Sequence, residues 1–173
     1  MIKTLALYSS VDGQTKRICQ RIGEHIKTDH DVTLIDIYNA TAVDLANYEK
    51  VILGGSVRYG KHRPEFEHFL IEQETLLSTK KTLLFSVNAT ARKTNKCLPS
   101  NNPYFIKLKH KTGIHADIEA VFAGKLHLAN NSIFDRFMIK LIFKMSGEQI
   151  GNGEIQFTDW GQVDRIATEF QQL

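Results

Sequence analysis

Cysteine is scarce in this sequence and long apolar runs are missing, and each shortage excludes a class of protein. The two cysteines, Cys19 and Cys97, match no metal-binding or redox spacing and fit a reducing compartment. No apolar run approaches the ~20 residues that cross a bilayer. The apolar stretch at residues 2–8 is too short for a signal peptide and ends in a turn, so we interpret it as a strand. We therefore expect a cytoplasmic protein with at most a peripheral membrane attachment.

The sequence also lacks clustered metal ligands and an excess of acidic residues. Its seven histidines form no ligand-like spacing, so we predict no metal site. The net charge is +3, and most of the basic surplus lies between Lys80 and Lys144. A basic half indicates an acidic partner, for which a membrane surface, a nucleic acid and a carboxylated substrate are the candidates.

What the sequence does contain is a regular alternation of short apolar stretches with helical patterns. Its 173 residues suffice for one sizeable core and are too few for two ordinary domains, so we assign one domain over residues 1–173. This alternation implies a doubly wound α/β fold, a parallel sheet covered on both faces, with the strand order 2-1-3-4-5. The predicted strands span residues 2–8, 32–37, 51–55, 82–88 and 118–124, and the predicted helices span 15–26, 64–77, about 103–111 and 160–170, with a helical turn near 42–46.

One segment, at about residues 125–153, does not fit this alternation. It carries a helical pattern of its own at roughly 133–145, and residues 154–157 then read as a strand at the edge of the sheet. We interpret the segment as a helical insertion that interrupts the fifth strand.

The loop after the first strand has the composition of a phosphate site. It leads directly into a helix, whose free N–H groups and dipole favour an anion, and Gly13 lets the backbone curl around a phosphate. The predicted phosphate-binding residues are Ser9, Ser10, Val11, Asp12, Gly13, Gln14 and Thr15. The loop has neither the Gly-Lys-Ser/Thr ending of nucleoside-triphosphate sites nor a G-x-G-x-x-G motif, so it suits one terminal phosphate. The alternative is a turn followed by a helix cap.

Two further loops should surround the same crevice, because the carboxyl ends of parallel strands meet at one edge of the sheet. Small polar residues there let backbone amides approach a flat heterocycle, and the ring of Tyr59 could stack on it. Tyr59 could equally be a surface aromatic that covers a helix end. The candidates in these loops are Ser56, Tyr59 and Gly60 after the third strand, and Ser86, Val87, Asn88 and Ala89 after the fourth.

Four stretches carry a resemblance to a known family. They read S-S-V-D-G-Q-T at 9–15, G-G-S-V-R-Y-G at 54–60, F-S-V-N-A-T-A-R-K at 85–93 and F-D-R-F-M-I-K-L-I-F-K-M-S-G at 134–147. Together they resemble the bacterial flavodoxin-like protoporphyrinogen oxidases, also named menaquinone-dependent protoporphyrinogen dehydrogenases. The resemblance covers nearly the whole chain, and the combination of motifs is much more specific than the first alone.

The resemblance implies a flavodoxin-like fold and an FMN enzyme of haem biosynthesis. Such an enzyme removes six electrons from protoporphyrinogen IX and passes them to a respiratory quinone, menaquinone or ubiquinone, at the cytoplasmic face of the inner membrane. Residues 9–15 would hold the FMN phosphate, and residues 86–89 would lie beside the flavin ring. No acid, base, quinone ligand or nucleic-acid partner follows from the resemblance, and a homo-oligomer stays open.

The insertion fits this function as an amphipathic helix at residues 132–146. Arg136, Lys140 and Lys144 recur every four residues as a cationic stripe, and apolar side chains occupy most of the remaining circumference. We predict that this helix binds an anionic membrane surface; alternatively, it packs on the sheet edge and displays the stripe to water.

The substrate's propionates need cationic partners. The candidates are Arg92, Lys93, Arg136 and Lys140, with the arginines first because guanidinium pairs bidentately with carboxylate. The alternative for each is a solvated surface charge.

Three rival functions remain at this stage. An electron-carrier flavodoxin is disfavoured by the basic charge, since such carriers usually present an acidic face. A NAD(P)H:quinone oxidoreductase of the same fold would use a nicotinamide donor. A phosphate-sensing or membrane-adaptor module without flavin would purify colourless.

Overall fold

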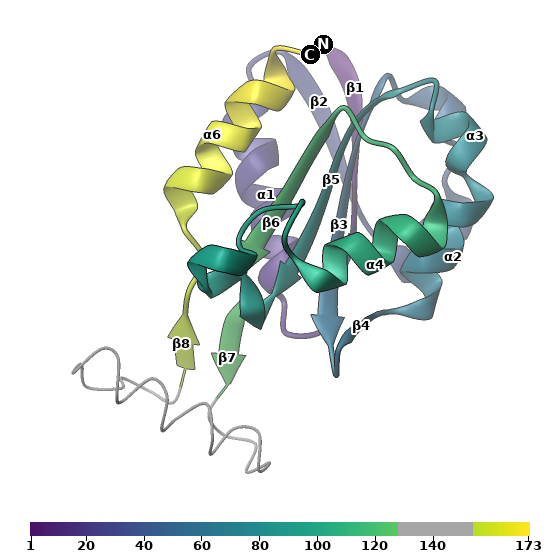
Figure 1. Ribbon diagram of the computed structural model, residues 1–173. Helices are drawn as coiled ribbons and strands as arrows, with labels where there is room; N and C mark the ends of the chain where they lie inside the picture. Colours follow the sequence, from purple (N-terminus) through teal and green to yellow (C-terminus); the bar gives the residue numbers. More distant parts are fainter. Residues whose placement is uncertain (128–153) are drawn as a thin grey trace.

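A parallel β-sheet runs through the middle of the computed structural model, which describes residues 1–127 and 154–173 (Figure 1). Its strands are β1 (Ile2–Ser9), β2 (His30–Asp36), β3 (Lys50–Arg58), β5 (Lys81–Asn88) and β6 (Ile118–Ala123). They lie in the order β2-β1-β3-β5-β6, which is the predicted order 2-1-3-4-5. In β1, Leu5 and Leu7 pack on one face, and Ala6 packs on the other, so a strand with two buried faces reads as a continuous apolar run.

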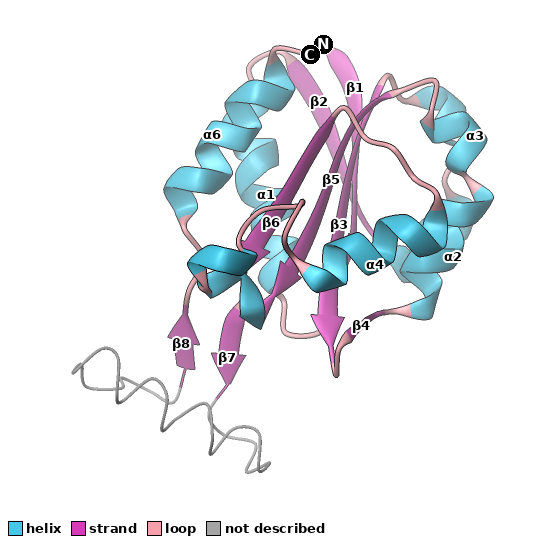
Figure 2. Cartoon of the chain, viewed as in Figure 1, coloured by secondary structure: helices cyan, strands magenta, loops and turns pink. Residues whose placement is uncertain are grey.

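Two helical layers cover the sheet (Figure 2). The helices α1 (Gln14–Ile26) and α6 (Trp160–Gln171) pack on one face around a core that includes Ile22, Phe85 and Phe170. The helices α2 (Pro64–Glu72), α3 (Glu74–Leu77) and α4 (Pro103–Thr112) cover the other face. The carboxyl ends of β1, β3 and β5 therefore lie together between the layers, where the sequence predicts a site.

Two glycines in the middle of β3 serve the packing on both faces of the sheet. A Cβ atom on Gly54 would lie 2.4 Å from the Phe85 ring, and one on Gly55 would lie 2.5 Å from the Phe66 ring. Phe85, on β5, and Phe66, on α2, are fully buried in the cores on opposite faces of the sheet. The two glycines thus let aromatic rings reach the centre of the sheet from both sides.

Several local elements differ from the sequence-based expectation. The helix predicted at 64–77 is divided at Gln73 into α2 and α3, and its apolar pattern continues across the break because Leu70 and Leu77 both contact the core. The turn predicted near 42–46 consists of two 3₁₀ helices, η1 (Ile37–Ala42) and η2 (Leu45–Asn47). A short strand that the sequence did not predict, β4 (Lys61–His62), pairs antiparallel with β3.

The prediction that residues 154–157 resume the edge of the main sheet is wrong. The strand β8 (Glu154–Gln156) pairs antiparallel with β7 (Lys125–His127) in a separate two-stranded sheet. The alternation of such a short segment indicates a strand but not its neighbour. The helix predicted at roughly 133–145 lies outside the described residues. Within residues 1–127 and 154–173, no helix has the length and apolar character to cross a membrane.

Candidate functional site

The loop between β1 and α1 holds a cluster of buried polar atoms without partners. The hydroxyl groups of Ser9, Ser10 and Thr15 and the Oε1 atom of Gln14 are buried and have no hydrogen-bond partner in the part of the chain that the structure describes. A buried unsatisfied polar group costs about 1–3 kcal/mol. Gly13, at φ 76°, turns the chain into α1, whose first turn has no side-chain cap. The three hydroxyls of the loop are therefore free donors where the helix dipole already favours an anion, while Gln14 Oε1 is an acceptor.

The opposite side of this loop is anchored to the C-terminal segment. Gln14 donates from Nε2 to Thr158 Oγ1 at 2.8 Å, and Thr158 donates in turn to the carbonyl oxygen of Ala123 at 2.7 Å. These bonds hold the loop against the end of β6.

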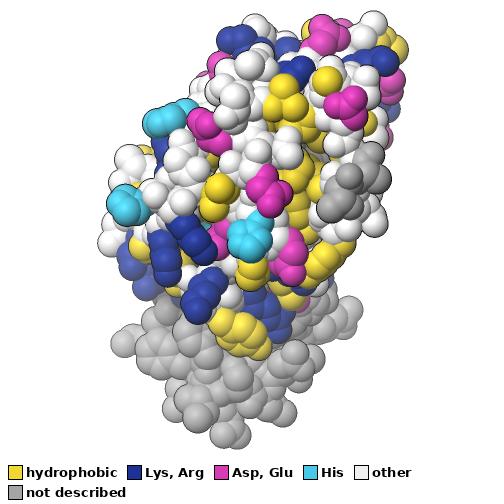
Figure 3. Space-filling view, turned by 90° about the vertical axis from the view of Figure 1, so that its right-hand side faces the viewer, with side chains coloured by type: hydrophobic (Ala, Val, Ile, Leu, Met, Phe, Trp, Pro, Cys, Tyr) yellow, Lys and Arg dark blue, Asp and Glu magenta, His cyan; other side chains and the backbone are white. Residues whose placement is uncertain are grey.

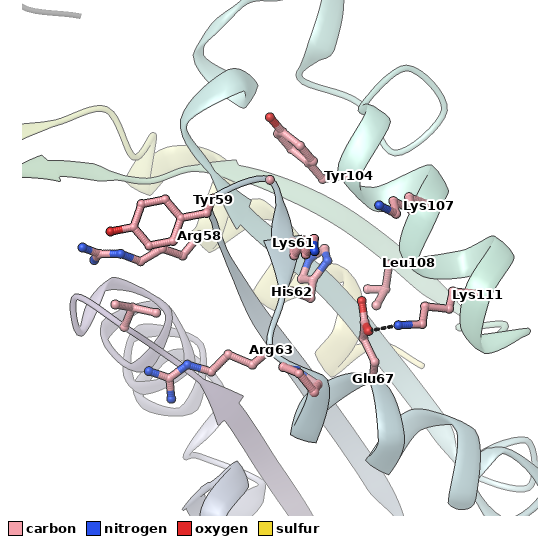
Figure 4. Close-up of a pocket in the computed structure, with 13 residues that line it drawn as sticks. Arg58, Tyr59, Lys61, His62, Arg63, Glu67, Tyr104, Lys107, Leu108 and Lys111 are labelled. Carbon is pink, nitrogen blue, oxygen red and sulfur yellow. Dashed lines mark hydrogen bonds and ion pairs between the residues drawn. The ribbon is translucent and has the colours of Figure 1, made fainter. Parts of the chain in front are cut away.

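The β3–β4 hairpin brings Tyr59 to the site in a strained conformation. Arg58 pairs with Lys61, so Tyr59 and Gly60 form a two-residue turn in which both residues have positive φ, 49° and 75°. Such turns favour Asn-Gly, and a bulky side chain in this conformation is a genuine outlier. The Tyr59 side chain is nonetheless 91% exposed, with the Arg58 guanidinium 5.3 Å from its ring centroid (Figure 4).

Arg58 also ties this hairpin to the phosphate loop. Its Nη1 atom donates to Asp12 Oδ1 at 3.0 Å. The pair places a cation beside the one acidic side chain of the loop, which reduces the repulsion between Asp12 and an anion bound there. Two of the predicted loops are thus brought together by an ion pair that the sequence analysis did not identify.

The third predicted loop, after β5, is fixed by a network of buried amides. Asn88 donates from Nδ2 to Ser86 Oγ at 3.2 Å and to Asn102 Oδ1 at 3.3 Å, and Asn102 donates back to Asn88 Oδ1 at 3.1 Å. Asn102 also caps α4 through the N–H groups of Tyr104 and Phe105. Asn102 is a site residue that the sequence analysis missed; the Asn102-Pro103 pair, a typical helix start, is the signal that could have found it.

A second missed residue is His62, which lies beneath the same loops. Its Nε2 atom lies 2.9 Å from Ser86 Oγ, a hydrogen bond whose donor depends on the tautomer, and its ring packs near Phe66. The residue is 5% exposed, and burial lowers the pKa of His62 to about 4. His62 is therefore neutral at physiological pH and acts as a hydrogen-bonding side chain of the interior.

Comparison with known proteins agrees with this architecture. The model of the family described as "Flavodoxin domain" matches residues 5–150. The chain belongs to this family. It is 37% identical to the protoporphyrinogen IX dehydrogenase [quinone] of Leishmania major over 99% of this chain and 75% of that protein. It is 36% identical to the protein of the same name from Escherichia coli K12, over 99% of this chain and 96% of that protein. The family resemblance read from the motifs is thereby confirmed.

Solved flavodoxins share the fold at low sequence identity. Oxidised flavodoxin 1 of Bacillus cereus is 15% identical, with a TM-score of 0.57 over 98% of this chain and 97% of that one. A Fusobacterium nucleatum flavodoxin bound to flavin mononucleotide is 14% identical, with a TM-score of 0.51 over 99% of this chain and 96% of that one. The flavodoxin-like fold of this family member is thus shown by sequence and structure together.

The candidate substrate residues of this flavodoxin-domain protein differ in their exposure, and two of them lie outside the described residues. Arg92 is partly buried, donates from Nη1 to the Ala89 carbonyl at 3.0 Å and lies over the Phe157 ring. Burial lowers the pKa of Arg92 from its usual range. Lys93 is exposed. Arg136 and Lys140 lie outside the described residues, so their role stays a prediction.

The two cysteines also differ in environment. Cys19 is buried on α1, where burial raises the pKa of its thiol, and Cys97 is half-buried in a loop. Among the described residues, no group of three His, Cys, Asp or Glu side chains could hold a metal ion.

His62 should make the protein acid-sensitive. Its pKa is lower in the folded than in the unfolded state, so its stabilising contribution is complete above the unfolded value of 6.5 and is lost as pH falls toward 4. At pH 4 the loss amounts to about 3 kcal/mol relative to pH 7. Urea unfolding of the wild type and of His62→Gln at pH 7, 5.5 and 4 should show a smaller pH dependence for the variant. His68→Gln, at an exposed position of α2, is the control; an identical pH dependence of wild type and His62→Gln would contradict this role.

Relief of the Tyr59 strain should stabilise the fold. Tyr59→Asn places a residue that tolerates positive φ in the turn, so the free energy of unfolding should rise by about 1 kcal/mol. Tyr59→Phe keeps the strained turn and should leave stability unchanged. Urea unfolding of the three proteins without added ligand measures the difference, and a destabilised Tyr59→Asn would show that the ring stabilises its own turn.

Proposed function

We propose that this protein is an FMN-dependent oxidoreductase that oxidises protoporphyrinogen IX and uses a quinone as electron acceptor. The observation that carries the proposal is the set of buried, unpartnered hydroxyls at the N-terminus of α1. The substrate and the acceptor follow from the names of relatives that match nearly the whole chain. The reaction removes six electrons and six protons from the porphyrinogen and converts three quinones to quinols.

The phosphate of FMN fits the loop by donor number and by charge. Ser9, Ser10 and Thr15 supply hydroxyl donors, and the N–H groups of the first turn of α1 add to them. Arg58 lies against the Asp12 carboxylate and offsets its charge. Bound there, FMN supplies the two-electron redox chemistry that no amino-acid side chain provides.

The chain's remaining contribution is to hold two walls beside the cofactor. The hairpin at Tyr59 forms one wall, tied to the phosphate loop by Arg58. The loop after β5 forms the other, and the Asn88–Asn102 pair keeps it rigid. The polar side-chain atoms of Ser86 and Asn88 form internal hydrogen bonds. We therefore expect the backbone of this loop and Ala89, rather than those two side chains, to contact the flavin.

We further propose that the protein works as a peripheral protein at the cytoplasmic face of the inner membrane. The support is the sequence of residues 132–146, where a cationic stripe borders an apolar arc. Each cation near an anionic surface contributes roughly 1 kcal/mol. A quinone partitions into lipid, so this location brings the acceptor to the enzyme.

Substitutions in the phosphate loop should weaken FMN binding without lowering the stability of the FMN-free protein. Ser9→Ala with Ser10→Ala removes two unpaired buried hydroxyls, so stability without FMN should stay equal or rise. The FMN dissociation constant should rise at least about ten-fold, because hydrogen bonds to charged groups contribute about 1.5–3 kcal/mol each. Quenching of FMN fluorescence measures affinity, and Ser100→Ala, at an exposed position, is the control. If the double variant bound FMN as tightly as the wild type, the FMN phosphate would not bind in this loop.

The two half-reactions test the activity itself. Anaerobic addition of protoporphyrinogen IX to the FMN-loaded protein should bleach the flavin absorbance, and a menaquinone analogue should then restore it. NADPH in place of the porphyrinogen should bleach the flavin slowly or not at all. Rapid bleaching by NADPH, or none by protoporphyrinogen IX, would overturn the proposed activity while leaving the fold intact.

A further inference from the structure

A cavity of about 660 Å³ opens between the β3–β4 hairpin and α4. Tyr59, Lys61 and Arg63 line it from the hairpin and the residue that follows, while Tyr104, Lys107 and Lys111 line it from α4 (Figure 4). Its volume lies within the range of about 300–1,000 Å³ that small-molecule sites occupy. Val11 of the phosphate loop also lines it, so the cavity adjoins the proposed FMN site.

The walls of this cavity are strongly cationic. Five of the lining residues are Lys or Arg, namely Arg58, Lys61, Arg63, Lys107 and Lys111, against the single acid Glu67. Figure 3 shows Lys and Arg side chains gathered low on the face that α2, α3 and α4 form. A molecule that enters the cavity therefore meets a positive potential.

Most of these cations are already engaged, and two are not. Glu67 pairs with Lys111, and Asp12 pairs with Arg58. Arg63 donates to the hydroxyl of Tyr38 at 2.8 Å, which fixes its guanidinium without neutralising it. Within residues 1–127 and 154–173, Lys61 and Lys107 have no ion-pair partner, and both are exposed. They come from opposite walls of the cavity (Figure 4).

The same cavity has flat and apolar surfaces. The ring of Tyr59 is 91% exposed, and Tyr104 and Pro64, which also line the cavity, add further apolar surface. Aromatic walls with unneutralised cations at their edge suit a flat apolar molecule that carries carboxylates on one side. A nucleotide site would instead need donors clustered around a phosphate, which in this chain lie in the loop before α1.

We propose that Lys61 and Lys107 bind the two propionate groups of a tetrapyrrole whose macrocycle packs against Tyr59 and Tyr104. This inference rests on the proposed function and assigns the carboxylate partners to residues that the sequence analysis did not select. Arg92, the first candidate from sequence, already donates to Ala89 and is desolvated by the fold. Among the described residues, Lys61 and Lys107 have no such competing partner.

The test is binding of protoporphyrin IX, the stable product, to the FMN-loaded protein. Porphyrin fluorescence in mild detergent should give a dissociation constant at least about ten-fold higher for Lys61→Ala with Lys107→Ala than for the wild type. FMN content should be unchanged. The control Lys3→Ala with Lys80→Ala removes the same charge outside the cavity, at the opposite end of the strands, and should bind as the wild type does. Lys61→Arg with Lys107→Arg should restore affinity.

The dimethyl ester of protoporphyrin IX separates carboxylate recognition from apolar packing. The ester should bind the wild type more weakly than the free acid, and the double alanine variant should bind it as the wild type does. Equal affinity of wild type and double variant for the free acid would overturn the inference, as would equal affinity of the wild type for acid and ester. If the double alanine variant lost affinity for NADPH and kept affinity for protoporphyrin IX, the cavity would be a nucleotide site and the inference would be overturned. Failure of the proposed function shows itself separately, as a wild-type flavin that protoporphyrinogen IX does not bleach.

Discussion

The site depends on hydroxyl groups that are buried at the start of α1 and have no hydrogen-bond partner among the described residues. Ser9 ends a strand that is paired on both sides, with β2 and with β3, so its position is fixed by the centre of the sheet. Thr15 lies on the first turn of a helix whose buried face packs on the same sheet. Neither residue can turn toward water without disturbing this packing. Groups buried without hydrogen-bond partners lower the stability of the fold, and an anion that accepts their hydrogen bonds offsets this loss.

The β3–β4 hairpin contains a second feature that lowers stability, a strained backbone conformation at Tyr59. A Tyr at positive φ lowers stability, and its ring is almost fully exposed, so burial does not compensate the strain. The conformation persists because the flanking pairs hold it, Val57 with His62 and Arg58 with Lys61. His62 then anchors the return strand by packing inward against Ser86. Rigid strands thus hold an aromatic ring in an exposed position, where a ligand bound in the cavity could cover it.

Sequence reasoning reached furthest where the signal is local in the chain. The strand order, which followed from the alternation of elements, is confirmed. The phosphate loop stays a prediction, and it could be made because its hydroxyls, its glycine and its helix are adjacent. Sequence reasoning failed where partners are distant. His62 forms a hydrogen bond with Ser86, 24 residues away, and Asn88 forms one with Asn102, 14 residues away. The pairing of β7 with β8 depends on the neighbour that tertiary structure supplies, which a short alternation does not encode.

The two anion sites that we propose, the phosphate loop and the cavity beside α4, differ in chemistry. The phosphate loop has no lysine and relies on hydroxyls, N–H groups and a helix dipole, which act over a short range and require exact placement. The cavity beside α4 relies on lysines, whose charge acts over a longer range and whose flexible stems tolerate variation in ligand position. Arg58 links the two, because it lines the cavity and pairs with Asp12 of the phosphate loop. A phosphate is thereby favoured where donors converge on one point, and separated carboxylates are favoured where cations stand apart. Under the proposed function, this division would let one face of a small domain hold an anionic cofactor and an anionic substrate together.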